Sequence, residues 1–183
     1  MILVKFRLKS LITVVLAAGT ALAMVAGGAV AAQADQSGDA DAQPSAVEDF
    51  AYPGADQILA GEGVELIAGD GHILYADCTV PPSGPVKFME VRTKAHLGPG
   101  DEGFLCFRVT GTRGWLTLSV PSVYEIRGDG HTRGTGHKAK ADLIGPAGDR
   151  KVVDLVPDGS TLVGDGISKE NGPATLVKLE VMP

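Results

Sequence analysis

The chain lacks the short motifs by which many enzymes and metalloproteins are recognised. No Gly-x-Ser-x-Gly and no His-Glu-x-x-His sequence occurs in its 183 residues, which excludes the serine elbow of α/β-hydrolases and the helical zinc site of metalloproteases. No segment carries the regularly spaced acidic residues of an EF-hand loop. These absences favour a binding or interaction protein, and an enzyme is the alternative.

Long hydrophobic runs are scarce, and the one that stands out lies near the N-terminus. Three basic residues precede a mostly apolar stretch from Leu11 to Val25, and Ala32-Gln33-Ala34 offers the small residues at which signal peptidase cuts. We therefore predict that residues 1–34 are a signal peptide and that the protein is secreted and extracellular. A retained membrane anchor is the alternative, because the run is nearly long enough to span a bilayer.

After residue 34, acidic residues outnumber basic ones. The first 34 residues hold three of the 16 Lys and Arg residues and none of the 22 Asp and Glu residues, which leaves 13 basic against 22 acidic residues. An acidic surface repels polyanions such as nucleic acids and anionic membranes. We therefore expect no nucleic-acid partner, and no membrane partner after signal cleavage.

Cysteine occurs twice, as Cys78 and Cys106. In an exported protein such a pair predicts a disulfide bond. A metal pair or a catalytic thiol is the alternative, but the 27 residues between the two cysteines match no common metal-ligand spacing. The bridge would therefore staple a single small domain.

The sequence divides after an acidic segment that is poor in large apolar residues. Residues 35–51 are rich in Asp, Ala, Gln, Ser and Gly, which predicts a disordered acidic leader. Residues 52–183 then form a single domain. It opens with one short helix over residues 55–60, in which Ile58 and Leu59 form the apolar face.

Short alternating or β-branched runs separated by Gly, Pro and Asp fill the rest of the domain, a pattern typical of an all-β fold. Their number and spacing predict an antiparallel two-sheet β-sandwich of Ig-like or jelly-roll-like architecture, with a closed barrel as the alternative. The predicted strands are Val64–Ile67, His72–Thr79, Val86–Thr93, Gly103–Thr110, Trp115–Val120, Val123–Arg127, Lys138–Ile144, Lys151–Val156, Thr161–Val163 and Ala174–Val181.

A Gly-Asp-Gly triplet occurs three times, around Asp70, Asp129 and Asp165. Asp-Gly supplies the positive φ angle of tight hairpins, so three hairpin corners are the first interpretation. The alternative is a calcium site, because loop aspartates and glycine-freed carbonyls suit this cation. We therefore expect no cofactor, with calcium held by these three aspartates as the alternative.

Glycine and positive charge concentrate in residues 127–140, within an otherwise acidic chain. The glycines would let backbone amides approach a ligand, so this glycine-rich basic loop is the preferred site for an anionic ligand, a glycan or an unknown extracellular protein. An exposed hairpin tip without a ligand is the alternative. The candidate binding residues are Arg127, His131, Arg133, His137 and Lys138.

Two other functions remain open beside binding. Loop histidines together with an acidic base could build a metal-dependent extracellular hydrolase. Such an enzyme requires a concave site in which His131 or His137 approaches an acid such as Asp129 or Glu125. The loops 79–86 and 111–114 are exposed segments that would suit a secreted protease inhibitor.

Four stretches, residues 52–59, 69–78, 114–118 and 123–130, resemble uncharacterised small secreted proteins of actinomycetes. The likeness extends over nearly the whole predicted mature chain. It implies an extracellular origin in a Gram-positive, GC-rich bacterium. It implies no activity and no catalytic residues.

Overall fold

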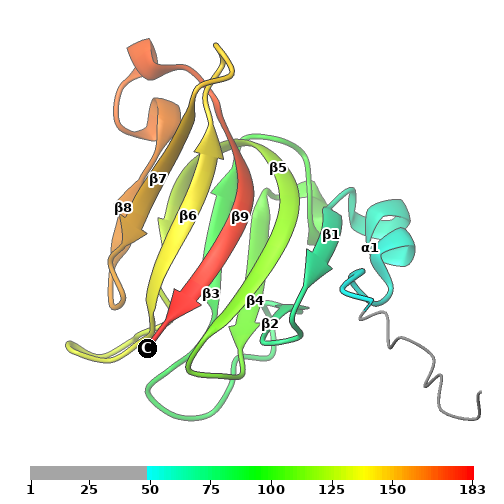
Figure 1. Cartoon of the computed structure of the whole chain (residues 1–183), viewed down its shortest axis with the longest axis vertical. Coiled ribbons are helices and arrows are strands. Elements are labelled where there is room, and N and C mark those ends of the chain that lie inside the picture. The colour runs from blue at the N-terminus through cyan, green and yellow to red at the C-terminus, as the bar shows by residue number, and fades with distance from the viewer. Residues whose placement is uncertain (1–48) are drawn as a thin grey trace, which may run out of the picture. The chain divides into compact units, whose positions relative to one another are not determined.

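The computed structural model describes residues 49–183. The predicted signal peptide, residues 1–34, and most of the predicted leader, residues 35–51, lie outside the described residues. Within the described part of the chain, one α-helix is followed by nine strands (Figure 1). The elements are α1 (Ala55–Glu62), β1 (Glu65–Gly69), β2 (Ile73–Ala76), β3 (Met89–Thr93), β4 (Phe104–Val109), β5 (Gly114–Arg127), β6 (Lys138–Ile144), β7 (Arg150–Leu155), β8 (Ser160–Leu162) and β9 (Ala174–Met182).

All strand pairs are antiparallel, and hydrogen bonds join the nine described strands into one sheet. The main path runs β2-β4-β3-β5-β9-β6-β7, while β1 and β8 each pair with β5. The prediction of a mostly β, antiparallel domain with one short helix is therefore confirmed. A division into two separate sheets is not seen, because β5 continues from one half of the hydrogen-bonded network into the other.

Strand β5 joins the two halves because it changes partners along its length. Residues 116–119 pair with β1, whereas residues 123–127 pair with β3 and β8. Between them the pairing with β9 shifts register twice, and Ser122 has a φ of 55°. Bulges of this kind bend a strand, and Figure 1 shows β5 curving until β3, β4 and β2 lie behind β9.

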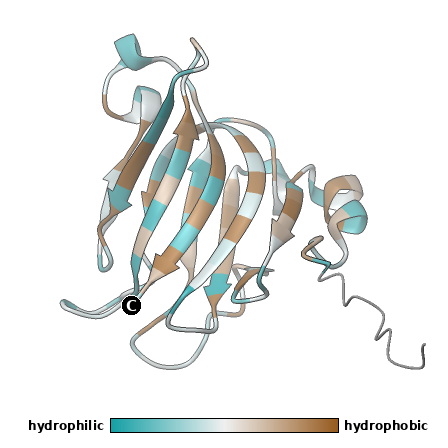
Figure 2. Ribbon diagram, viewed as in Figure 1, coloured by the Kyte–Doolittle hydropathy of each residue, from teal (hydrophilic) through white to brown (hydrophobic). Residues whose placement is uncertain are grey.

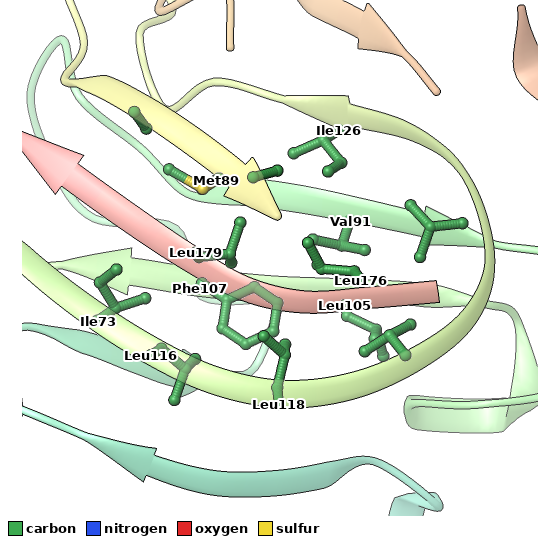
Figure 3. Packing of buried hydrophobic residues seen from close by; sticks show 14 of the residues in the cluster. Ile73, Met89, Val91, Leu105, Phe107, Leu116, Leu118, Ile126, Leu176 and Leu179 are labelled. Carbon is green, nitrogen blue, oxygen red and sulfur yellow. The ribbon is translucent and has the colours of Figure 1, made fainter. Parts of the chain in front are cut away.

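The core lies in the space enclosed by this curved sheet. Leu116, Leu118 and Val120 of β5 are fully buried, which confirms the alternation predicted for this segment. Hydrophobic and hydrophilic residues alternate along the strands in Figure 2, and Figure 3 shows buried side chains of β3, β4, β5 and β9 gathered between the strands. Burial of each such side chain contributes about 1.5 to 3 kcal/mol.

Two details of the predicted strands are wrong. The segments Trp115–Val120 and Val123–Arg127 are one strand, because the chain bends through Pro121 and Ser122 without leaving the sheet. In β9, strict alternation would place Val177 on the core face with Leu179, but Val177 is only half-buried. The irregular pairing between β9 and its neighbours shifts the alternation, so Leu176 is buried instead.

The predicted disulfide bond is confirmed. Cys78, in the loop after β2, is bonded to Cys106 of β4, with 5.3 Å between their Cα atoms. Asp77, beside Cys78, accepts hydrogen bonds from the backbone nitrogen and the hydroxyl of Thr79, both at 2.8 Å. These two bonds hold the pKa of the Asp77 carboxyl below its usual value. Cys78 therefore lies in a turn that is ordered by hydrogen bonds between its two neighbours.

Candidate functional site

The chain between β5 and β6 folds back on itself through unusually close backbone packing. The amide of Gly128 donates to the carbonyl of Gly159 at 3.0 Å, and the amide of Gly130 donates to the carbonyl of Pro157 at 2.9 Å. A Cβ atom at Gly128 would lie 2.2 Å from the carbonyl oxygen of Pro157, and one at Gly136, whose φ is +89°, would lie 2.5 Å from it. Gly128 and Gly136 are thus required for this packing.

This packing brings Asp129 and His137 together. The Oδ1 atom of Asp129 accepts a hydrogen bond of 2.8 Å from the backbone nitrogen of His137, and Oδ2 lies 2.6 Å from the ring Nδ1. The Asp129 side chain is 0% exposed and that of His137 is 26% exposed. A buried carboxylate therefore fixes a partly exposed imidazole in place.

His137 is one of the residues that line a cavity of about 600 Å³. Three parts of the chain that are distant in sequence form its walls: the loop before β3, the end of β4 with the loop that follows, and the residue before β6. The lining residues are Pro82, Ser83, Val86, Lys87, Arg108, Val109, Thr110, Gly111, Thr112 and His137.

The cavity is electropositive although the chain is acidic. Its lining includes Lys87 and Arg108 but no Asp or Glu. The amino group of Lys87 donates to the carbonyl of Pro82 at 2.7 Å, and within residues 49–183 neither Lys87 nor Arg108 forms an ion pair with a carboxylate. Both positive charges remain available to a ligand.

Two long-range contacts attach the loop before β3 to the glycine-rich segment. The amide of Lys87 donates to the carbonyl of Asp129 at 2.7 Å, and the amide of His131 donates to the carbonyl of Pro85 at 3.0 Å. Val86 also forms an isolated antiparallel bridge with Gly130. Lys87 and His137 therefore reach one cavity through backbone pairing.

The predicted basic loop does not act as one cluster. Arg127 lies on β5 opposite Glu90 of β3, and its Nε atom is buried without a hydrogen-bond partner in the described structure. His131 and Arg133 are exposed, and neither lines the cavity. The amino group of Lys138 donates to the carbonyl of Pro183 at 3.3 Å. Of the five candidates, only His137 faces the cavity.

Sequence reasoning missed the two cations of the cavity. Lys87 and Arg108 stand 21 residues apart and far from His137 in the chain, so no local pattern connects them. The exposed loops 79–86 and 111–114 were identified, and they contribute Ser83 and Thr112 to the lining. Exposure was the available signal, but it gave no indication that the two loops meet.

The three candidate metal aspartates lie in separate places. Asp70 accepts from the backbone nitrogens of His72 and Trp115, both at 3.1 Å, whereas Asp165 pairs with the amino group of Lys94 at 2.5 Å. Within residues 49–183, no group of three or more His, Cys, Asp or Glu residues is placed to hold a metal ion. Calcium binding stays a prediction without support from this geometry.

The Gly-Asp-Gly triplets are not tight hairpin corners. Asp70 follows β1 and precedes β2, which do not pair with each other, and the same is true of Asp129 between β5 and β6. Asp165 lies in the short 3₁₀-helix η2 (Gly164–Gly166). In each case the aspartate side chain fastens its loop to another residue, which explains the recurrence better than turn geometry.

A second polar group anchors helix α1 to the sheet. The Tyr75 hydroxyl donates to the carboxylate of Glu62, and the Tyr75 amide donates to the Tyr52 hydroxyl at 2.8 Å. Burial, reinforced by the Glu62 carboxylate, raises the pKa of the Tyr75 phenol far above its usual value, and burial also raises that of Tyr52. Both phenols therefore stay protonated and serve as structural donors or acceptors.

The aromatic side chains of Tyr75 and Trp115 pack against other rings of the domain. The Tyr75 ring meets Phe107 edge to face at 5.6 Å, and the Trp115 ring lies 5.8 Å from Phe50. Tyr75 and Trp115 are themselves half-buried. Their geometry is that of ordinary aromatic pairs, which leaves the cavity beside His137 as the candidate site.

Comparisons with known proteins assign no family to the chain. No protein-family model matches the chain, and no curated protein matches it significantly. In residues 49–183, no helix has the length and apolar character needed to cross a membrane.

Proposed function

We propose that this protein binds a small anionic ligand, through a phosphate group, in the cavity beside His137. One observation carries the proposal: the cavity places the positive charges of Lys87 and Arg108 on one surface with no acidic residue in its lining. In a chain with more acidic than basic residues, such a site concentrates anions that the rest of the surface repels.

Phosphate suits the lining better than carboxylate does. The cavity offers donors of three kinds, namely the guanidinium of Arg108, the amino group of Lys87 and the hydroxyls of Ser83 and Thr112. A tetrahedral anion presents oxygens in several directions and can use donors from several walls, and Arg binds phosphate in bidentate fashion. The volume of about 600 Å³ is within the range of small-molecule sites.

The proposal includes secretion and a layered architecture. A disulfide bond between the only two cysteines suits an oxidising compartment, which supports the export predicted from residues 1–34. The change of partners along β5 supports a β-sandwich in which this strand belongs to both layers. The ligand would then be met outside the cell.

Replacing Arg108 by alanine tests the binding site. Because Arg108 contributes a full positive charge and several donors, we expect the dissociation constant for inorganic phosphate to rise about tenfold or more. Titration of the purified protein with phosphate, followed by NMR chemical shifts at fixed pH and ionic strength, measures this change. Shifts in the unmodified protein should centre on residues 83–87, 108–112 and 137.

Two other arginines provide matched controls. Arg113 is exposed in the same loop as Thr112, and Arg133 is exposed in the glycine-rich loop, but neither lines the cavity. Arg113→Ala and Arg133→Ala should each change phosphate affinity less than twofold. If Arg133→Ala weakens binding while Arg108→Ala does not, the ligand binds at the glycine-rich loop and the cavity proposal is wrong.

A further inference from the structure

The hydrogen bonds of His137 determine which ring nitrogen can react. The Nδ1 atom lies 2.6 Å from Oδ2 of Asp129, a carboxylate oxygen that can only accept when ionised, so Nδ1 carries a proton. In the neutral ring the opposite nitrogen, Nε2, then bears the free lone pair. It has no hydrogen-bond partner among residues 49–183, and His137 lines the cavity.

The Asp129 carboxylate orients this ring more firmly than packing alone would. It is fully buried, and it binds both the backbone nitrogen and the ring of the same residue. Two contacts to one residue fix both the position of the ring and its tautomer. A general base held by a buried carboxylate and directed at a bound ligand is the arrangement used in proton transfer catalysis.

We propose that His137 is the catalytic acid and base in the hydrolysis of a phosphate ester bound in this cavity, with Asp129 as its positioning residue. The inference rests on the proposed phosphate site. It adds turnover to binding, and it assigns the substrate to esters in which the phosphate group occupies the electropositive cavity and the esterified alcohol extends from it.

The reaction needs only water as its second substrate. Nε2 accepts a proton from a water molecule as the water oxygen bonds to phosphorus, and the bond between phosphorus and the ester oxygen breaks. The proton on Nε2 then passes to the departing alkoxide, which leaves as an alcohol. The phosphate product retains the water oxygen, and His137 returns to its neutral form.

The cations of the cavity would assist the same step. Lys87 and Arg108 line the cavity together with His137, so they are placed to interact with the phosphoryl oxygens. Positive groups that are held in position before the reaction stabilise the charge that develops on those oxygens. Binding and proton transfer therefore depend on different residues, which allows them to be tested separately.

His137→Asn separates catalysis from folding. The asparagine amide can donate to Asp129 approximately where Nδ1 does, but it has no basic nitrogen in place of Nε2. With p-nitrophenyl phosphate and bis(p-nitrophenyl) phosphate as probes, we expect kcat to fall about 10²- to 10⁴-fold. Phosphate affinity should stay within about threefold of that of the unmodified protein. His131→Asn, on the exposed histidine of the same segment, should leave both quantities unchanged.

Asp129→Asn tests the positioning role. Its amide nitrogen, placed toward Nδ1, would donate a hydrogen bond and move the ring proton to Nε2, which removes the lone pair from the cavity. We expect kcat to fall about 10²- to 10⁴-fold with KM nearly unchanged. A merely structural role would instead lower the folded fraction without reducing the turnover of each folded molecule.

The outcomes separate this inference from the binding proposal. If phosphate binds but neither probe is hydrolysed above the buffer rate, or if His137→Asn is as active as the unmodified protein, the catalytic inference is overturned and binding stands. Hydrolysis of p-nitrophenyl acetate without hydrolysis of either phosphate probe also overturns it. If phosphate does not bind at all, the binding proposal itself fails.

Discussion

Replacing His137 by alanine should lower the free energy of unfolding by about 3 kcal/mol. The substitution leaves the Asp129 carboxylate, which is 0% exposed, without the ring that satisfies Oδ2. Its bond to the backbone nitrogen of residue 137 can persist, but a buried charge that loses its partner is among the costliest single changes in a protein. Urea unfolding followed by the fluorescence of Trp115, the only tryptophan, measures the loss.

A double variant and a control identify the cause of this loss. Adding Asp129→Ala to His137→Ala removes the unpaired charge. We therefore expect the free energy of unfolding of the double variant to be about 1 to 3 kcal/mol higher than that of His137→Ala. His131→Ala should change stability by less than about 0.5 kcal/mol, because its side chain is exposed. If His137→Ala proves as harmless as His131→Ala, the buried pair does not form in solution.

Local sequence pattern was enough to predict most of the strands, with β5 as the exception. The predicted segment Lys138–Ile144 coincides with β6, and the helix predicted over residues 55–60 extends only two residues further as α1. The alternation of apolar and polar residues, and the glycines between strands, are local patterns in the sequence, so they can be recognised without knowledge of the fold. The disulfide bond followed equally well, because a single pairing is possible with two cysteines.

The bend of β5 was not visible in the sequence. Proline is typical of a strand end, which agrees with the predicted strand Trp115–Val120 ending just before Pro121. In the structure Pro121 is exposed, and its carbonyl accepts a hydrogen bond from the hydroxyl of Thr93. A contact with β3, 28 residues away, therefore decides that the chain continues as strand.

One contact of the candidate site was predicted from the sequence, whereas the two cations that line the cavity were not. The expectation that His131 or His137 would approach Asp129 or Glu125 in a concave site is met by the pair Asp129 and His137. The predicted binding cations, Arg127, Arg133 and Lys138, followed from the charge density along residues 127–140, and none of them lines the cavity. The pairing of Val86 with Gly130, which brings Lys87 into place, depends on the folded sheet.

Breaking the Cys78–Cys106 bridge should lower the free energy of unfolding by about 3 to 4 kcal/mol. The bonded residues are separated by 28 positions, and a loop of this size gains substantial conformational entropy in the unfolded chain once the bond is cut. Cys106 is 3% exposed in β4, so the folded state also loses the anchor of the loop after β2. Urea unfolding with and without dithiothreitol, and of the variant Cys78→Ala/Cys106→Ala, measures the loss.

Reduction of the disulfide bond should lower the stability of the domain but leave phosphate binding in the cavity nearly unchanged. Pro85 and Lys87 are held by backbone hydrogen bonds to His131 and Asp129, which do not depend on the disulfide. Phosphate affinity of the reduced protein, measured where it is still fully folded, should therefore stay within about threefold of that of the oxidised form. Dithiothreitol should have no effect on the double-alanine variant, which has no other cysteine. If reduction leaves stability unchanged but abolishes phosphate binding, the bridge orders the site and not the domain, contrary to this account.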